Sequence, residues 1–456
     1  MVWAMKAIGS LFAVAAFAAL VPGLALADQD KTSVHDCHIG AYRLGDGGLV
    51  DVGPSNGQTL RWRRFDGTTG ALTQGADGTW TSTRGWTGKP DGHKISFAAC
   101  GVGELAYDGQ AARRIAFDVT DTTFQGAGVN LAGRLVLPKG AGAVPIVILI
   151  HGSEDYSGRD FYSLQRILPA EGVGVFVYDK RGTGASEGRY TQDFEVLADD
   201  AAAAIGEARR MAGPRAGRVG FQGGSQGGWI APLAATKAKA DFVISSFGLL
   251  VSPLEEDREE AALELKLKGH SQAEIDQAMD VVDAVGAYVS ADLKSGYDRF
   301  DALRAKDKDA PWYKDLHGNF TWMLLPLSDA QAKAKASELV MGTPWRYDGM
   351  DVERRLSTPQ LWIQGTDDLE APYAETRRRL DALAAAGKPI TRALFPRAEH
   401  GIYQYELDQS GERHDSRNAE GYFAMMRDFA RDGRLGGAYG DSTVMAPKAA
   451  VAASGR

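Results

Sequence analysis

The sequence predicts an α/β protein, in which a mostly parallel sheet carries helices on both faces. Short apolar runs rich in β-branched residues recur at residues 145–150, 173–178, 218–222 and 242–246, and strands of this kind are typically buried on both faces. Helical stretches separate the runs, the longest being the Ala-rich segment at residues 192–211. Strands that alternate with helices in this way form a parallel sheet covered on either side.

A helical insertion interrupts this alternation. Residues 252–350 are charge-rich, mostly helical in pattern and without a buried strand. Apolar runs then resume at residues 359–363 and 390–395. We therefore assign residues 113–251 and 351–435 to the α/β core, and the segment between them to a helical cap.

The pattern of residues 28–112 predicts a small all-β domain that precedes the core. Asp-Gly and Asn-Gly pairs recur there about every ten residues, as in the tight hairpins of a small sandwich or barrel. Three tryptophans, Trp62, Trp80 and Trp86, either line a ligand groove or fill the small core. Filling the core is the preferred interpretation.

A secretory signal peptide is expected at residues 1–27. An uncharged apolar run at residues 7–20 is followed by Ala25-Leu26-Ala27, which fits the small-residue cleavage rule. An uncleaved membrane anchor is the alternative, although the run is shorter than the ~20 residues of a spanning helix. Export would carry the only two cysteines, Cys37 and Cys100, into an oxidising compartment. There we expect a disulfide rather than two buried thiols.

The composition excludes some partners. The chain has 456 residues and a net charge of -8, whereas nucleic-acid binding needs clustered Lys and Arg. No segment after the signal peptide is apolar enough to span a bilayer, which predicts a soluble mature protein in the periplasm or outside the cell. The densest charged run, Glu255 to Glu260, indicates the solvated face of a helix. Residues 436–456 are small, polar and Ala-rich, and we expect disorder there.

The strongest functional motif is Gly223-Gly224-Ser225-Gln226-Gly227. It follows the predicted strand at residues 218–222 and opens a predicted helix, the context in which a nucleophilic serine stands on a strained turn. Small residues must lie two positions before and two after such a serine, and Gly223 and Gly227 meet this need. The helix start also directs its dipole at developing negative charge. Ser225 is therefore the candidate nucleophile.

A serine hydroxyl needs a base to act as a nucleophile near neutral pH. His400 follows the last predicted strand, where a base would reach Ser225, whereas His414 lies in a polar run that indicates surface. The acid should follow the preceding strand, and we choose Asp368, with Asp367 as the alternative. Its role would be to hold the tautomer of His400 and to stabilise the imidazolium.

Two backbone N–H groups should bind the oxyanion that forms during acyl transfer. Gln226 supplies one of them, because it directly follows the nucleophile. The loop after residues 145–150 should supply the other, with the N–H of Ser153 as the candidate. His151 in the same loop is interpreted as structural, because the triad already contains a base.

These motifs resemble the α/β-hydrolase superfamily and, within it, bacterial exported esterases and related peptidase-like hydrolases of the S9, S15 and S33 types. The resemblance spans roughly residues 113–435 and implies the α/β-hydrolase fold, with a helical cap inserted after the sixth sheet strand. It also implies hydrolysis of ester, thioester or amide bonds through an acyl-enzyme. The matching blocks are His151-Gly152-Ser153, Tyr178-Asp179-Lys180-Arg181-Gly182-Thr183-Gly184, the serine motif, Gly365-Thr366-Asp367-Asp368 and Ala398-Glu399-His400-Gly401.

Three functions are consistent with these residues. Hydrolysis of small or medium carboxylic esters or thioesters is the first, and a peptidase acting on short peptides is the second. The third is an inactive binding protein that keeps the hydrolase fold and binds through its β domain, although an intact triad argues against it. The expected partner is a small-molecule ester or a peptide, the chemistry requires no cofactor or metal, and the oligomeric state is left open.

Overall fold

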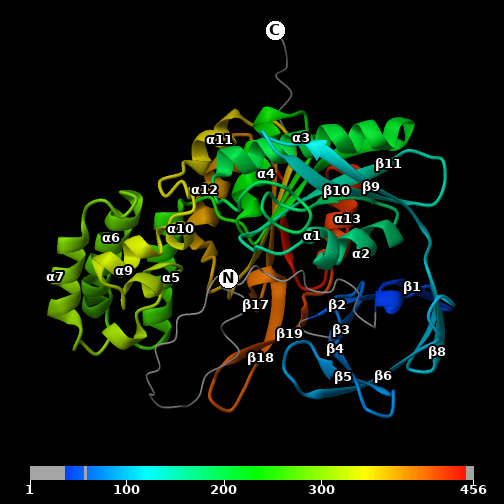
Figure 1. The fold of residues 1–456 in the computed structure, drawn as a ribbon, viewed down its shortest axis with the longest axis horizontal. Helices are drawn as coiled ribbons and strands as arrows, with labels where there is room; N and C mark the ends of the chain where they lie inside the picture. The colour runs from blue at the N-terminus through cyan, green and yellow to red at the C-terminus, as the bar shows by residue number, and fades with distance from the viewer. Residues whose placement is uncertain (1–35, 56–58, 448–456) are drawn as a thin grey trace, which may run out of the picture.

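The computed structural model describes residues 36–55 and 59–447, which form a β-barrel, an α/β core and a group of cap helices. In Figure 1 the barrel lies at the lower right, the core above it and the cap helices at the left. The signal peptide expected at residues 1–27 lies outside the described residues. Within the described part of the chain, no helix combines the length and apolar character needed to cross a bilayer.

The all-β domain is a closed barrel in which each strand pairs antiparallel with the next and β8 returns to β1. Its tight turns use the Asp-Gly pairs of the sequence: Gly47 and Gly67 have φ angles of 87° and 97°, which glycine adopts without a steric penalty. Cys37 and Cys100 are joined by a disulfide, as expected. The strands are β1 Gly40–Leu44, β2 Leu49–Pro54, β3 Leu60–Arg64, β4 Thr69–Gln74, β5 Trp80–Arg84, β6 Pro90–Phe97, β7 Glu104–Tyr107 and β8 Gln110–Arg114.

Two of the three tryptophans fill the barrel, as the sequence predicts. Trp62 is fully buried and Trp80 nearly so, and both belong to the apolar cluster of the barrel. Trp86 lies outside this cluster. Its ring contacts that of Tyr403, with 4.7 Å between the centroids, so this tryptophan joins the barrel to the rest of the chain.

The core contains a mostly parallel sheet of order β20-β16-β15-β14-β13-β11-β12-β10-β9. The strands from β11 to β16 run parallel, and the strands at both edges pair antiparallel. This confirms the predicted fold class. The strands are β9 Phe117–Gln125, β10 Asn130–Pro138, β11 Val144–Ile150, β12 Gly174–Tyr178, β13 Ala216–Gly224, β14 Val243–Ser246, β15 Gln360–Gly365, β16 Ile390–Phe395 and β20 Thr443–Met445.

The last of these strands corrects part of the disorder expected at residues 436–456, of which residues 448–456 lie outside the described residues. Residues 443–445 pair antiparallel with β16 and so form an edge of the sheet. Val444 packs against the core beneath. The composition of the segment is poor in apolar residues, but the open edge of β16 offers backbone groups that a short strand can satisfy.

Helices cover both faces of the sheet. α3 (Phe194–Ala212) and α4 (Gly227–Lys237) share one apolar cluster with the sheet, while α2 (Leu164–Ala170) and α13 (Tyr422–Asp432) share the other. β11 contributes alternate side chains to the two clusters, because successive residues of a strand point to opposite faces. The remaining core helices are α1 Gly158–Phe161, α11 Gly349–Arg355 and α12 Tyr373–Ala385.

The cap helices stand between β14 and β15. The first begins with a capping box: the Ser252 hydroxyl accepts a hydrogen bond from the N–H of Glu255, whose carboxylate accepts one from the N–H of Ser252. This motif satisfies two otherwise unpaired helix-end donors. The elements are α5 Pro253–Leu267, α6 Gln272–Ser290, α7 Tyr297–Asp307, the 3₁₀ turn η4 Tyr313–Asp315, α8 Thr321–Leu324, α9 Asp329–Ala334 and α10 Ala336–Leu339.

The charged run Glu255 to Glu260 does not form the solvated face that the sequence indicates. Asp257 is fully buried, and Glu260 is 3% exposed. The carboxylate of Asp257 accepts hydrogen bonds from the backbone of Phe320 and Thr321. The expectation of a solvated face is wrong because the loop before α8 covers this side of α5. The density of charge within α5 carries no information about a loop so distant in the sequence.

A small antiparallel sheet lies below the core and beside the barrel in Figure 1. It consists of β17 Ala398–Glu399, β18 Tyr403–Leu407 and β19 Arg413–Asn418, and His400 follows directly after β17. The barrel contacts it through two hairpin turns. The N–H of Asn418 donates to the carbonyl of Gly67 (3.0 Å), and the N–H of Trp86 donates to the carbonyl of Asp415 (2.7 Å).

Candidate active site

Ser225 stands on a strained turn between β13 and α4. Its φ angle is 53°, in the left-handed region that non-glycine residues rarely adopt. The turn is held by the N–H of Ser225, which donates to the carbonyl of Ser246 (3.1 Å). A Cβ added to Gly223 would lie 2.1 Å from the carbonyl oxygen of Gly227. The two glycines therefore allow the tight approach that the sequence motif predicts.

His400 and Asp368 form a buried hydrogen-bonded pair. The Nδ1 atom of His400 lies 3.2 Å and 3.1 Å from the two carboxylate oxygens of Asp368. Because a carboxylate only accepts, Nδ1 is the protonated nitrogen and Nε2 is left to face a substrate. Asp367, the alternative acid, instead accepts hydrogen bonds from Thr366 and Tyr405.

Phe247 connects this pair with the serine turn. Its ring lies 4.8 Å from the imidazole of His400, edge to face. On the other side, a Cβ added to Gly224 would lie 2.5 Å from the Phe247 ring. The residue before Ser225 and the imidazole thus contact the same aromatic side chain.

The loop after β11 lies beside the serine. A Cβ added to Gly152 would lie 3.6 Å from the Cβ of Ser225, and Ser153 is the next residue. Gln226 directly follows Ser225 and occupies the position before the first residue of α4. His151 is buried, and its Nε2 atom lies 2.6 Å from the carbonyl oxygen of Tyr178, which agrees with a structural role.

Lys180 contacts this loop, a role that the sequence analysis does not assign to it. Its Nζ donates to the carbonyl oxygen of Gly152 (2.8 Å) and lies 4.5 Å from the ring centroid of Tyr190. The hydroxyl of Tyr190 in turn donates to the carbonyl oxygen of Ser153. Burial lowers the pKa of Lys180 to about 8. The signal in the sequence is the place of Lys180 in the block Tyr178 to Gly184, two residues after a buried strand.

A carboxylate lies near the Nε2 atom of His400. The Oε2 atom of Glu370 is 3.9 Å from His400 Nε2. Burial lowers the pKa of His400, but the charges of Asp368, Glu370 and Glu256 together outweigh burial and raise it to about 9. Burial also raises the pKa of the Glu256 carboxyl well above its usual range. The surroundings of His400 therefore favour positive charge.

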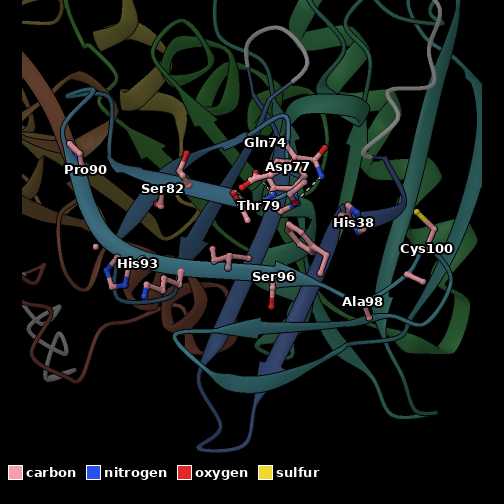
Figure 2. Close-up of a pocket in the computed structure, with 18 residues that line it drawn as sticks. His38, Gln74, Asp77, Thr79, Ser82, Pro90, His93, Ser96, Ala98 and Cys100 are labelled. Atoms are coloured by element: carbon pink, nitrogen blue, oxygen red, sulfur yellow. Dashed lines mark hydrogen bonds between the residues drawn. The ribbon is translucent and has the colours of Figure 1, made fainter.

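A separate hollow of about 890 Å³ lies on the barrel. Figure 2 shows it lined by β-strand side chains, with Pro90 and His93 toward one end and Ala98 and Cys100 toward the other. All of its lining residues belong to the barrel domain, and Trp80 among them packs into the barrel core. This hollow is therefore not the place where the candidate triad would act.

Three groups of side chains among the described residues have the types and proximity of metal ligands. None of them includes Ser225, Asp368 or His400. In the first group, the two cysteines are already joined to each other. The groups are Cys37, His38 and Cys100; Glu260, Glu264 and His317; and Asp408, Glu412 and His414.

Part of the core and the start of the cap match a known protein family. Residues 142–279 match the family described as serine aminopeptidase, S33. No match was found among curated proteins.

Several solved structures are similar to the chain. A Pyrococcus furiosus esterase aligns with a TM-score of 0.40 and 15% identity, over 62% of this chain and 83% of its own. A Pyrococcus horikoshii acylaminoacyl peptidase aligns with a TM-score of 0.43 and 15% identity, over 85% of this chain and 57% of its own. A Mycobacterium tuberculosis puromycin-hydrolyzing peptidase aligns with a TM-score of 0.39 and 18% identity, over 80% of this chain and 50% of its own.

At such scores and identities we infer nothing about substrate from these structures. The strand order of the sheet, the strained serine turn between β13 and α4, and the family match across both elements carry the assignment. Together they show the α/β-hydrolase fold, and the family match itself covers residues 142–279.

Proposed function

We propose that this protein is a serine hydrolase that cleaves carboxylic ester or thioester bonds through an acyl-enzyme. Ser225 is the nucleophile, His400 the base and Asp368 the acid that orients it. The observation that carries the proposal is the buried hydrogen bond between His400 and Asp368. It leaves Nε2 as the basic nitrogen, which is what a serine nucleophile needs.

In the proposed reaction, His400 Nε2 takes the proton of Ser225 Oγ as this oxygen bonds to the substrate carbonyl carbon. The backbone N–H groups of Gln226 and Ser153 stabilise the negative charge on the carbonyl oxygen. The bond to the leaving group then breaks, and His400 returns the proton to it. Water releases the acyl group by the same steps. No step requires a metal or an organic cofactor.

A peptidase acting on short peptides is the second candidate. Glu370 favours it, because its carboxylate, 3.9 Å from His400 Nε2, would attract the ammonium group of a peptide N-terminus toward His400. Recognition of an uncharged ester does not need a carboxylate beside the reacting bond. The two candidates share one mechanism and differ in what is recognised beside the reacting bond.

Fluorophosphonate labelling tests the nucleophile. We expect one labelled residue, Ser225, with labelling abolished in Ser225→Ala and retained in Ser153→Ala. The second variant is the matched control, because only the backbone of Ser153 is given a role. If Ser225 of the folded wild type is not labelled, the enzymatic proposal fails and the inactive binding protein is favoured.

Rates on p-nitrophenyl esters and aminoacyl p-nitroanilides separate the two candidates. A kcat/KM higher for uncharged esters supports the esterase. A kcat/KM that is higher for anilides with a free amino group, and lower when that group is acetylated, supports the peptidase. The same substrates assayed with Ser225→Ala give the background.

We also propose that the protein is exported to the periplasm or outside the cell. The disulfide of the barrel is compatible with an oxidising compartment. N-terminal sequencing of the protein recovered from cell fractions tests this. A mature chain beginning at Asp28 supports export, and an intact Met1 in the cytoplasm contradicts it.

A further inference from the structure

Two glutamates of the cap face one histidine, away from the candidate triad. Glu260 and Glu264 are four residues apart on α5 and so project from the same side of the helix. His317, in the segment between η4 and α8, lies opposite them. Its Nδ1 atom is 4.0 Å from Glu260 Oε1 and 3.7 Å from Glu264 Oε2. The three ligand-type atoms lie within 4.8 Å of one another.

One carboxylate is buried and the other nearly so, and each has an oxygen without a hydrogen-bond partner among the described residues. The Glu260 side chain is 5% exposed and that of Glu264 is 15% exposed. In each, the Oε2 atom is buried and has no hydrogen-bond partner in the described part of the chain. Across residues 36–55 and 59–447, no Lys or Arg nitrogen lies within ion-pair distance of either glutamate. Buried carboxylates normally have a cation or several donors as partners.

Packing around the cluster fixes the position of His317. Asp257, one turn before Glu260 on the same helix, accepts hydrogen bonds from the N–H groups of Phe320 (2.8 Å) and Thr321 (3.0 Å). Gly318 has a φ of 71°, and a Cβ there would lie 2.7 Å from the Asp257 carboxylate. The chain next to His317 is therefore held tightly against α5.

An aromatic ring fixes the imidazole plane as well. Trp322 stacks on His317 with 5.3 Å between the ring centroids and 10° between the planes. The imidazole is thus oriented before any ligand arrives, and pre-ordered side chains lower the cost of binding.

An ordinary ion pair does not account for the cluster. A protonated His317 would supply one positive charge for two carboxylates, and the separations of 3.7 Å and 4.0 Å exceed hydrogen-bond length. A divalent cation would balance both carboxylates and draw all three side chains onto a common centre.

We propose that Glu260, Glu264 and His317 bind one divalent transition-metal ion of the Zn²⁺ type, which links α5 to the segment before α8. One imidazole with two carboxylates suits Zn²⁺, whereas Ca²⁺ and Mg²⁺ prefer oxygen ligands alone. Ligand atoms about 2.1 Å from a shared Zn²⁺ lie roughly 3.4 Å apart at a tetrahedral angle. The two separations between His317 and the glutamates, 3.7 Å and 4.0 Å, exceed this value by about 0.3–0.6 Å.

The site is independent of the proposed hydrolysis. It uses none of the triad residues, and its role is to hold two parts of the cap together. Its test therefore measures binding and stability rather than turnover. The full chain is treated with EDTA, dialysed, and titrated with ZnCl₂ by calorimetry and with CoCl₂ by visible absorption.

We expect one equivalent of Zn²⁺ per chain with a micromolar or lower Kd, and a Tm that rises with Zn²⁺ concentration. His317→Gln and Glu264→Gln should each weaken binding at least about tenfold and abolish the Tm shift. His270→Gln is the control within the cap, because its imidazole pairs with Asp315 outside the cluster. His414→Gln is a second control, because His414 belongs to a different group of metal-ligand type, with Asp408 and Glu412. Both controls should bind as the wild type does.

Some results would overturn the proposal. One is the absence of one-to-one binding in the wild type, or a Co²⁺ spectrum unchanged by the protein. Another is binding retained in both His317→Gln and Glu264→Gln, or lost in His414→Gln. Glu264→Gln keeps the side-chain size and removes one of two neighbouring charges, so it should fold without metal. The Co²⁺ spectrum of the wild type gives a result that depends on no variant.

Discussion

Asp367 and Asp368 are neighbours in sequence but have different partners. Asp368 pairs with His400, whereas Asp367 is occupied by Thr366 and Tyr405. We expect Asp368→Asn to lower kcat roughly 10⁴-fold, because an amide no longer holds the required imidazole tautomer. Asp367→Asn, the matched control, should keep kcat within a few-fold. Equal losses in the two variants would contradict the assignment, and both are measured with one ester substrate.

Glu370 should control the pH dependence of the reaction. The base must be neutral to accept a proton, and the pKa of His400 in the free protein is about 9, so kcat/KM should rise from pH 7 to pH 9. Glu370→Gln removes a negative charge near Nε2 and should move this rise to lower pH. Each unit of decrease in the pKa raises the neutral fraction at pH 7 about tenfold.

The pH profile of an exposed variant provides the comparison. Glu412 lies in the turn between β18 and β19 and is exposed, so Glu412→Gln should leave the profile unchanged. A Glu370→Gln profile that coincides with the wild type would show that this carboxylate does not act on His400.

At the scale of elements, the turn between β13 and α4 depends on glycine for space. A Cβ at Gly223 would meet the carbonyl oxygen of Gly227 at 2.1 Å. We expect Gly223→Ala to cost about 1–3 kcal/mol of stability through overpacking. Displacing Ser225 by even 1 Å should also lower kcat by about 10²-fold. Thermal unfolding and ester hydrolysis measure the two effects.

Gly206 is the control for this substitution. It lies on the exposed side of α3, and nothing stands within 4 Å of an added Cβ. Gly206→Ala should therefore raise stability by about 0.5–1 kcal/mol and leave activity unchanged. If both alanine variants behave alike, the tight turn is not what makes Gly223 necessary.

At the scale of the whole molecule, the barrel supports the segment that carries His400. The ring of Trp86 contacts Tyr403, three residues after His400, and the guanidinium of Arg61 lies 3.8 Å over the same tryptophan. A second contact ties the barrel to α2, where Arg166 binds the buried carboxylate of Asp51 at 2.6 Å. The barrel is therefore attached to the core on two sides.

Removing the contact at Trp86 should impair catalysis from the barrel. Trp86→Ala loses an aromatic pair worth about 0.5–1.5 kcal/mol beyond its buried area, and we expect kcat to fall about tenfold as the segment after His400 loosens. Trp80→Phe is the control, because Trp80 packs inside the barrel. It should lower Tm without changing kcat. A Trp86→Ala variant with a normal kcat would show that this contact of the barrel does not support catalysis.

Local patterns in the sequence were sufficient for much of the fold and part of the site. Apolar runs and turn pairs predicted the core strands and the all-β domain, because burial and turn chemistry act within a few residues. The glycines around Ser225 predicted the strained turn for the same reason. The two cysteines predicted their own disulfide, since no other partner exists.

Only the tertiary structure decided which distant residues meet. It paired His400 with Asp368 rather than Asp367, brought Lys180 to Gly152, and placed Glu260 beside His317 instead of in solvent. It also closed the barrel and set it against the strands after His400. These contacts join residues far apart in the chain, and their free energy depends on how whole elements pack, which no local pattern contains.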